Sequence, residues 1–133
     1  MKSYFFYTDQ LTVGYDGKPL IREINIRLNK GEILTLIGPN GAGKSTILKS
    51  ITRQLSLISG TVYLEQAEMS RMTNKEVSKK LAVVLTERMR PELMTCEDVV
   101  ATGRYPYTGT LGILSEEDKQ KVRNAMELSL IHI

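Results

Sequence analysis

The sequence has one cysteine and one histidine among its 133 residues. A single thiol cannot form a disulfide within the chain, and so low a cysteine content is typical of a protein from a reducing compartment. No histidine or cysteine lies at metal-ligand spacing from Cys96, which argues against a metal-binding or nucleophilic role. We therefore interpret Cys96 as an inert, half-buried thiol, and His132 near the end of the chain as incidental.

Long apolar runs and a large excess of charge are also lacking. No apolar run approaches the roughly 20 residues that a membrane-spanning helix needs, and the first residues, Met1–Tyr4, do not resemble a signal peptide. The net charge is +3, from 18 Lys and Arg against 15 Asp and Glu, and the basic residues are dispersed. We therefore predict a cytoplasmic protein without a nucleic-acid partner.

The first third of the chain has the pattern of β-strands. Tyr4–Val13 is predicted to be a strand, and Asp16-Gly17 predicts a hairpin turn into a second, antiparallel strand over Ile21–Leu28, where apolar and polar residues alternate. Two further segments, Glu32–Ile37 and Leu81–Leu85, are almost continuously apolar. That pattern is typical of strands buried on both faces.

Helical signals follow. Lys44–Thr52 has apolar residues at helical spacing, and Gly60–Leu64 is predicted to be a short strand. Thr73, Thr95 and Ser115 each precede an acidic residue three positions later, which predicts three helix N-termini, the first helix running to about Lys80. The order of elements, antiparallel strands first and then strand–loop–helix units, predicts an α/β architecture.

A glycine-rich loop lies between the first predicted buried strand and the helix after it. The pattern G-x-x-x-x-G-K-[ST] is met at Gly38, Gly43, Lys44 and Ser45. Such a loop can direct its backbone N–H groups at phosphates, with the helix N-terminus and a lysine adding positive charge and the serine hydroxyl able to bind Mg²⁺. An ordinary glycine turn is the alternative, but the strand before and the helix after the loop favour phosphate binding. The predicted nucleotide-binding residues of the loop are Gly38, Pro39, Asn40, Gly41, Ala42, Gly43, Lys44, Ser45 and Thr46.

The full string Ile37–Thr46 resembles the ATP-binding cassette (ABC) family more closely than kinases or small GTPases. Upstream, Leu11–Tyr15 resembles the A-loop of that family, which implies that Tyr15 stacks on the adenine of ATP; the alternative is a packed turn residue. The resemblance implies ATP and Mg²⁺ as ligands. It also implies a P-loop NTPase (RecA-like) core with an N-terminal antiparallel β-subdomain.

Downstream, Thr95–Tyr107 resembles the segment found in ATPases of iron–siderophore, haem and cobalamin importers. The resemblance implies that transmembrane permease subunits bind the region Thr86–Tyr107, and that the intact ATPase is a head-to-tail homodimer at the inner face of the cell membrane. The alternative is a helix end and a proline turn with no bearing on substrate.

The chain departs from the family at several points. Thr86 stands where the family has the Q-loop glutamine, so Thr86 or Glu87 is a further candidate Mg²⁺ ligand beside Ser45. The signature sequence, the Walker B aspartate with its catalytic glutamate and the switch histidine are all missing, so no catalytic residue is assigned. We therefore expect residues 1–127 to be the N-terminal part of an ABC ATP-binding domain.

The last six residues, 128–133, match the translated end of a transposon used to prepare sequencing libraries, so we expect a non-native read-through tail there. The resemblance as a whole implies an ATPase that powers uptake of an iron–siderophore-type complex. Two alternatives stay open. One is an ABC-type ATPase without a role in transport, and the other is a different P-loop enzyme such as a nucleotide kinase.

Overall fold

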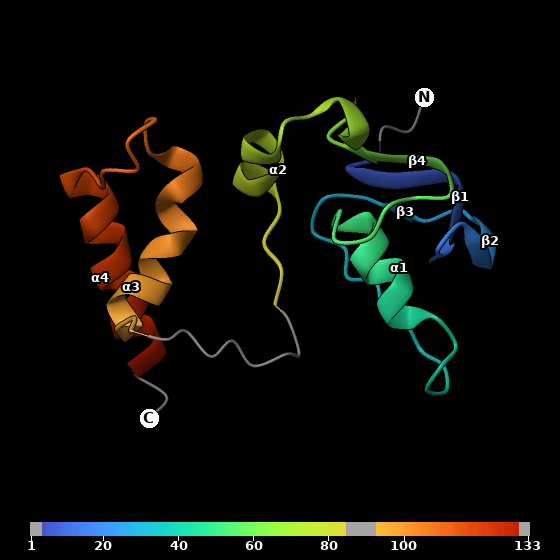
Figure 1. Ribbon diagram of the computed structural model, residues 1–133, viewed down its shortest axis with the longest axis horizontal. Helices are drawn as coiled ribbons and strands as arrows, with labels where there is room; N and C mark the ends of the chain where they lie inside the picture. Colours follow the sequence, from blue (N-terminus) through green and yellow to red (C-terminus); the bar gives the residue numbers. More distant parts are fainter. Residues whose placement is uncertain (1–3, 85–92, 131–133) are drawn as a thin grey trace. The chain divides into compact units, whose positions relative to one another are not determined.

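The structure, a computed structural model, describes residues 4–84 and 93–130. The chain forms two compact units, Met1–Val77 and Ser78–Ile133. The first contains an antiparallel sheet with a helix packed on it, and the second contains two neighbouring helices in its C-terminal part (Figure 1). None of the helices in the described ranges combines the length and the apolar character of a membrane span.

The sheet of the first unit is built on strand β1 (Phe6–Tyr15). It pairs antiparallel with β2 (Lys18–Ile24) on one side and with β4 (Ser59–Leu64) on the other. Two-residue strands, β3 (Arg27–Leu28) and β5 (Ala67–Glu68), complete the sheet beside β1 and β4 respectively. The predicted antiparallel strands are thus confirmed, although the second predicted strand is divided into β2 and β3.

The hairpin between β1 and β2 forms at the predicted turn. Asp16 and Gly17 have φ angles of 50° and 73°, the left-handed values that a tight two-residue hairpin turn requires. The inner face of β1 buries Leu11 and Val13 completely, and Val62 of β4 packs into the same core. The turn fixes the register in which Tyr15 pairs with Lys18, so the end of β1 has a defined position.

Two strand predictions are wrong. Residues 32–37 form no strand, and Ile33 and Ile37 are 93% and 89% exposed. Residues 81–84 are also without strand structure, and Val84 is 99% exposed, while Leu85 lies outside the described residues. A strand buried on both faces needs a neighbouring strand and covering layers. Within the described part of the chain, the sheet of β1 to β5 offers neither segment a paired strand.

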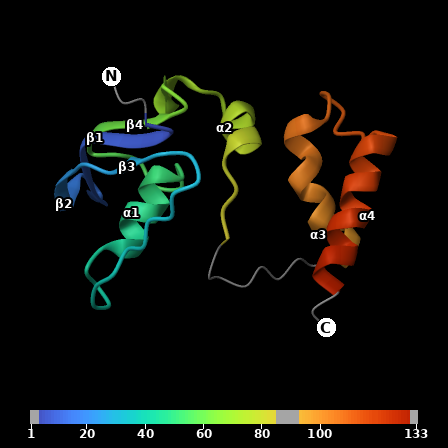
Figure 2. The ribbon, with the colours of Figure 1, turned by 180° about the vertical axis from the view of Figure 1, so that it is seen from behind.

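The helices begin where the capping patterns predict. Helix α1 (Lys44–Ile51) follows the glycine-rich loop and packs on β1, and α2 (Asn74–Lys80) ends at the predicted residue. In the second unit, α3 (Cys96–Ala101) continues into the 3₁₀ helix η2 (Thr102–Tyr107), and α4 (Glu116–Leu130) lies alongside α3 (Figures 1 and 2). A further 3₁₀ turn, η1 (Met69–Arg71), precedes α2.

Two details of the helices bear on earlier predictions. Cys96 is exposed rather than half-buried, because it is the first residue of α3 and lies beside the helix cap. Helix α4 includes residues 128–130 of the predicted read-through tail. The other residues of the tail, 131–133, which include His132, lie outside the described ranges. That the tail is non-native stays a prediction.

Candidate nucleotide-binding site

The glycine-rich loop adopts backbone angles that only glycine takes without strain. Gly41 and Gly43 have φ angles of 84° and 92°, in the left-handed region. Gly43 is also the N-cap residue of α1, and a Cβ atom at this position would lie 2.5 Å from Cδ1 of Ile21 on β2. The backbone angle therefore favours glycine at position 43, and a Cβ there would also displace the end of the Ile21 side chain.

The positive charge of the site comes from Lys44 and from the start of α1. The Lys44 ammonium donates hydrogen bonds to the carbonyl oxygens of Gly38 and Pro39, at 2.6 and 2.7 Å, so it is folded back over the loop. The first turn of α1 contains no acidic residue, which leaves the partial positive charge of its N–H groups uncompensated. Together these groups supply the positive charge that the motif predicts for an anion-binding site, and anion binding itself stays a prediction.

Tyr15 lies at the edge of the same site. It is the last residue of β1, and its hydroxyl lies 3.2 Å from the hydroxyl of Thr46, a buried residue in the first turn of α1. The Tyr15 side chain nevertheless stays 49% exposed. Tyr15 is therefore held at its hydroxyl end while about half of its side chain is exposed, and its stacking on adenine stays a prediction.

Tyr15 and the loop line a common cavity of about 300 Å³. A cavity of this size, lined by a lysine, a glycine-rich loop and one aromatic ring, suits part of a nucleotide. Its lining residues are Tyr15, Leu20, Asn40, Gly41, Gly43, Lys44, Ser45 and Thr46. The predicted residues Gly38 and Pro39 take part through the carbonyl groups that hold Lys44, and the amide of Ala42 donates to the Pro39 carbonyl at 3.2 Å within the loop.

One lining residue, Leu20, was missed by sequence reasoning. It is half-exposed on β2, and its side chain is close to Gly43. The only signal that could have found it is the hairpin register, which places it two residues after the partner of Tyr15. That register depends on the exact bounds of the turn, and the sequence pattern leaves these bounds open.

The residues present fit a magnesium ion only in part. Ser45 is exposed and lines the cavity, so its hydroxyl is placed to be one ligand. Within residues 4–84 and 93–130, no group of three or more His, Cys, Asp or Glu side chains could hold a metal ion. The other proposed ligands, Thr86 and Glu87, lie outside the described residues.

Comparison with known proteins places this site in a family. The profile of the ABC transporter family matches residues 21–132. An uncharacterized ABC transporter ATP-binding protein of Methanocaldococcus jannaschii is 50% identical over 113 residues, which cover 85% of this chain and 39% of that protein. The iron(3+)-hydroxamate import ATP-binding protein of Bacillus subtilis is 38% identical over 120 residues, and these cover 90% of this chain and 45% of that protein.

Two further comparisons also match ABC transporter ATP-binding proteins. The ferric enterobactin transport ATP-binding protein of Escherichia coli is 30% identical over 119 residues, or 90% of this chain and 44% of that protein. A solved structure of an ABC transporter ATP-binding protein from Pyrococcus furiosus matches with a TM-score of 0.60 at 29% identity, covering 73% of this chain and 46% of that one. The chain therefore spans less than half the length of each of these relatives.

The likeness to the solved structure confirms the predicted α/β fold with a P-loop NTPase core. The family match covers most of the chain and includes the entire glycine-rich loop, and this family implies nucleotide binding. Which residues bind the nucleotide stays a prediction. The chain belongs to the ABC transporter family.

Proposed function

We propose that this chain is part of the ATP-binding subunit of an importer, in which ATP hydrolysis drives uptake of an iron–siderophore-type complex. The cavity between Tyr15 and the glycine-rich loop is the observation that carries the nucleotide part of this proposal. The cargo class is supported by the printed names of the relatives from Bacillus subtilis and Escherichia coli, which are import or transport proteins for iron chelates.

Each part of the site has a task in binding ATP. The N–H groups of the loop and of the first turn of α1 donate to phosphate oxygens, and the Lys44 ammonium exchanges its bonds to the Gly38 and Pro39 carbonyls for bonds to phosphate. Tyr15 supplies a flat surface for the adenine. Mg²⁺, when bound with ATP, neutralises phosphate charge, and Ser45 is the residue of the described chain that would hold it, with Thr86 or Glu87 as further candidates.

The second unit offers a surface for the proposed membrane partner. Of the predicted docking region Thr86–Tyr107, residues 93–107 are described, and they include α3 and η2. Tyr105 and Tyr107 of η2 are 54% and 47% exposed. Large aromatic side chains are typical anchors of protein interfaces, which supports docking of transmembrane permease subunits here. A head-to-tail homodimer at the inner face of the membrane completes the proposal.

The function is tested with the chain and whatever follows it in its gene, which we call the full-length protein. If a gene for a membrane subunit lies beside its own, this protein together with that subunit in vesicles is expected to take up an iron–siderophore complex only when ATP is supplied. An ATPase that binds no membrane subunit would favour the non-transport alternative. Transfer of phosphate from ATP to a second nucleotide would favour a nucleotide kinase, an alternative that the family match already argues against.

Tyr15→Ala is expected to weaken ATP binding by ~1–3 kcal/mol, the range for a base stacked on an aromatic ring. Isothermal titration of the full-length protein with ATP and with inorganic triphosphate measures the effect, and triphosphate affinity should change little. Tyr15→Phe is the matched control, because it keeps the ring and removes only the hydroxyl beside Thr46. Equal losses for both ligands in Tyr15→Ala would contradict the stacking role.

A further inference from the structure

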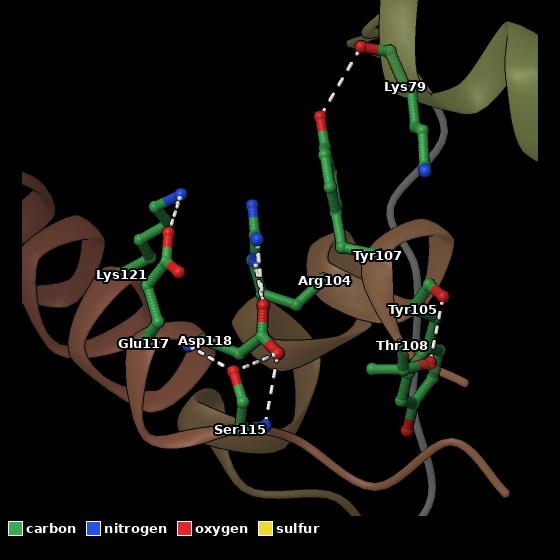
Figure 3. Close-up of polar contacts among 9 residues, drawn as sticks. All are labelled: Lys79, Arg104, Tyr105, Tyr107, Thr108, Ser115, Glu117, Asp118 and Lys121. Carbon is green, nitrogen blue, oxygen red and sulfur yellow. Dashed lines mark hydrogen bonds and ion pairs between the residues drawn. The ribbon is translucent and has the colours of Figure 1, made fainter.

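Two helices of the second unit begin with the same cap, and one of them is tied to a further residue. At α3, the Asp98 carboxylate accepts hydrogen bonds from the backbone N–H and the hydroxyl of Thr95, at 2.8 and 2.6 Å. At α4, Asp118 accepts the same two bonds from Ser115, at 3.0 and 2.7 Å. Asp118 alone also accepts from Arg104: its Oδ1 lies 2.8 Å from Nε and 2.7 Å from Nη2 (Figure 3).

The Arg104–Asp118 pair is shielded from water. The two side chains are 17% and 8% exposed, whereas the other ion pairs of α4, such as Lys121 with Glu117, lie at the surface. The hydrogen bond from the Ser115 hydroxyl, and then that from Arg104, lower the pKa of Asp118 to about 2. A largely shielded pair with several hydrogen bonds favours one arrangement of its neighbours, whereas exposed pairs contribute little.

Arg104 also contacts an exposed aromatic residue. Its guanidinium carbon lies 4.0 Å from the centre of the Tyr107 ring, close enough for a cation–π contact. In the same 3₁₀ helix, Tyr105 is held through its carbonyl, which accepts a hydrogen bond from the Thr108 hydroxyl at 2.9 Å. The carboxylate of Asp118 therefore fixes both the start of α4 and, through Arg104, the segment η2 that presents the two tyrosines.

We propose that Arg104 and Asp118 are positioning residues that hold Tyr105 and Tyr107 of η2 in the arrangement that binds the membrane subunit. The proposal rests on the proposed function, because it names the part of the chain that communicates with that subunit. A surface held rigid before binding loses less side-chain freedom on docking than a mobile one. Coupling of ATP hydrolysis to the membrane subunit would then depend on an ion pair of the second unit, while nucleotide binding would depend on the loop of the first.

Asp118→Asn in the full-length protein tests this, with Glu76→Gln in α2 as the matched control, outside the proposed docking region. Both substitutions alter the same type of helix cap, since Glu76 accepts hydrogen bonds from the backbone N–H and the hydroxyl of Thr73, but only the first removes the charge that holds Arg104. Asp118→Asn is expected to weaken binding of the detergent-solubilised membrane subunit by about tenfold, the cost of ordering two tyrosine side chains on docking. ATP affinity should stay unchanged in both variants.

Arg104→Lys is a second variant, which keeps the charge at this position. A lysine cannot both pair with Asp118 through two nitrogens and stack on Tyr107, so a similar loss of membrane-subunit binding is expected. Equal effects of Asp118→Asn and Glu76→Gln would show a role in helix capping only and would overturn the inference. A parallel loss of ATP affinity would overturn it as well. If the unaltered protein binds no membrane subunit, the proposed function itself fails.

Discussion

Replacing Lys44 with alanine is expected to lower the rate of ATP hydrolysis by the full-length protein by about 100- to 1,000-fold, the loss typical of removing one preorganised charge from a transition state. Lys44 is positioned for this role, because its ammonium lies over the loop on the Gly38 and Pro39 carbonyls. The alanine variant keeps the loop backbone N–H groups, so we expect residual nucleotide binding that no longer discriminates strongly for the γ-phosphate.

The measurements are the dissociation constant for ATP, with and without Mg²⁺, and the steady-state rate of phosphate release. Lys49→Ala is the matched control, because Lys49 lies in the last turn of the same helix and outside the cavity lining. The thermal unfolding temperatures of both variants show whether a loss of ATP binding comes from the missing side chain or from a less stable fold. If Lys44→Ala left both the dissociation constant and the rate unchanged, the loop would not be the phosphate site.

Features that depend on neighbours in the sequence could be predicted. The glycine-rich loop was found because its glycines, lysine and serine meet in one short segment and need no long-range contact. The hairpin was found for the same reason, since the φ angles of Asp16 and Gly17 are a property of the turn itself. The helix caps at Thr95 and Ser115 form within one turn and were also predicted correctly.

Features that depend on contacts between distant segments of the chain could not be predicted from the sequence. Tyr15 and Thr46 are 31 positions apart, and Arg104 and Asp118 are 14 apart, so both contacts depend on how the chain is folded. The same limit explains the wrong strands. The apolar run of residues 32–37 indicates that the segment favours burial. Whether it is buried depends on neighbouring strands that come from other parts of the sequence. The apolar pattern that includes Ile33 and Ile37 was therefore noted correctly, but the prediction that other strands and helices bury these side chains was wrong.

The second large effect concerns the chain of residues 1–127 by itself, which is expected to show no ATP hydrolysis at a catalytic rate. Its sequence contains the phosphate loop but no Walker B carboxylates and no signature sequence. In the described part of the chain, no cluster of carboxylate, histidine or cysteine side chains could hold a metal ion. A bound magnesium ion would have Ser45 as its protein ligand there, and no positioned base would orient the attacking water.

The exposed apolar segments predict a second property of the same chain. Ile33, Ile37 and Val84 are almost fully exposed, and unpaired apolar segments of this kind promote association between molecules. Residues 1–127 should therefore bind a hydrophobic dye and self-associate, whereas the full-length protein should do so much less and should hydrolyse ATP. Size-exclusion chromatography and phosphate release measure the two properties. A monomeric 1–127 chain with the turnover of the full-length protein would mean that the catalytic groups already lie within these residues, and that the apolar segments at 33–37 and 81–84 need no further strands.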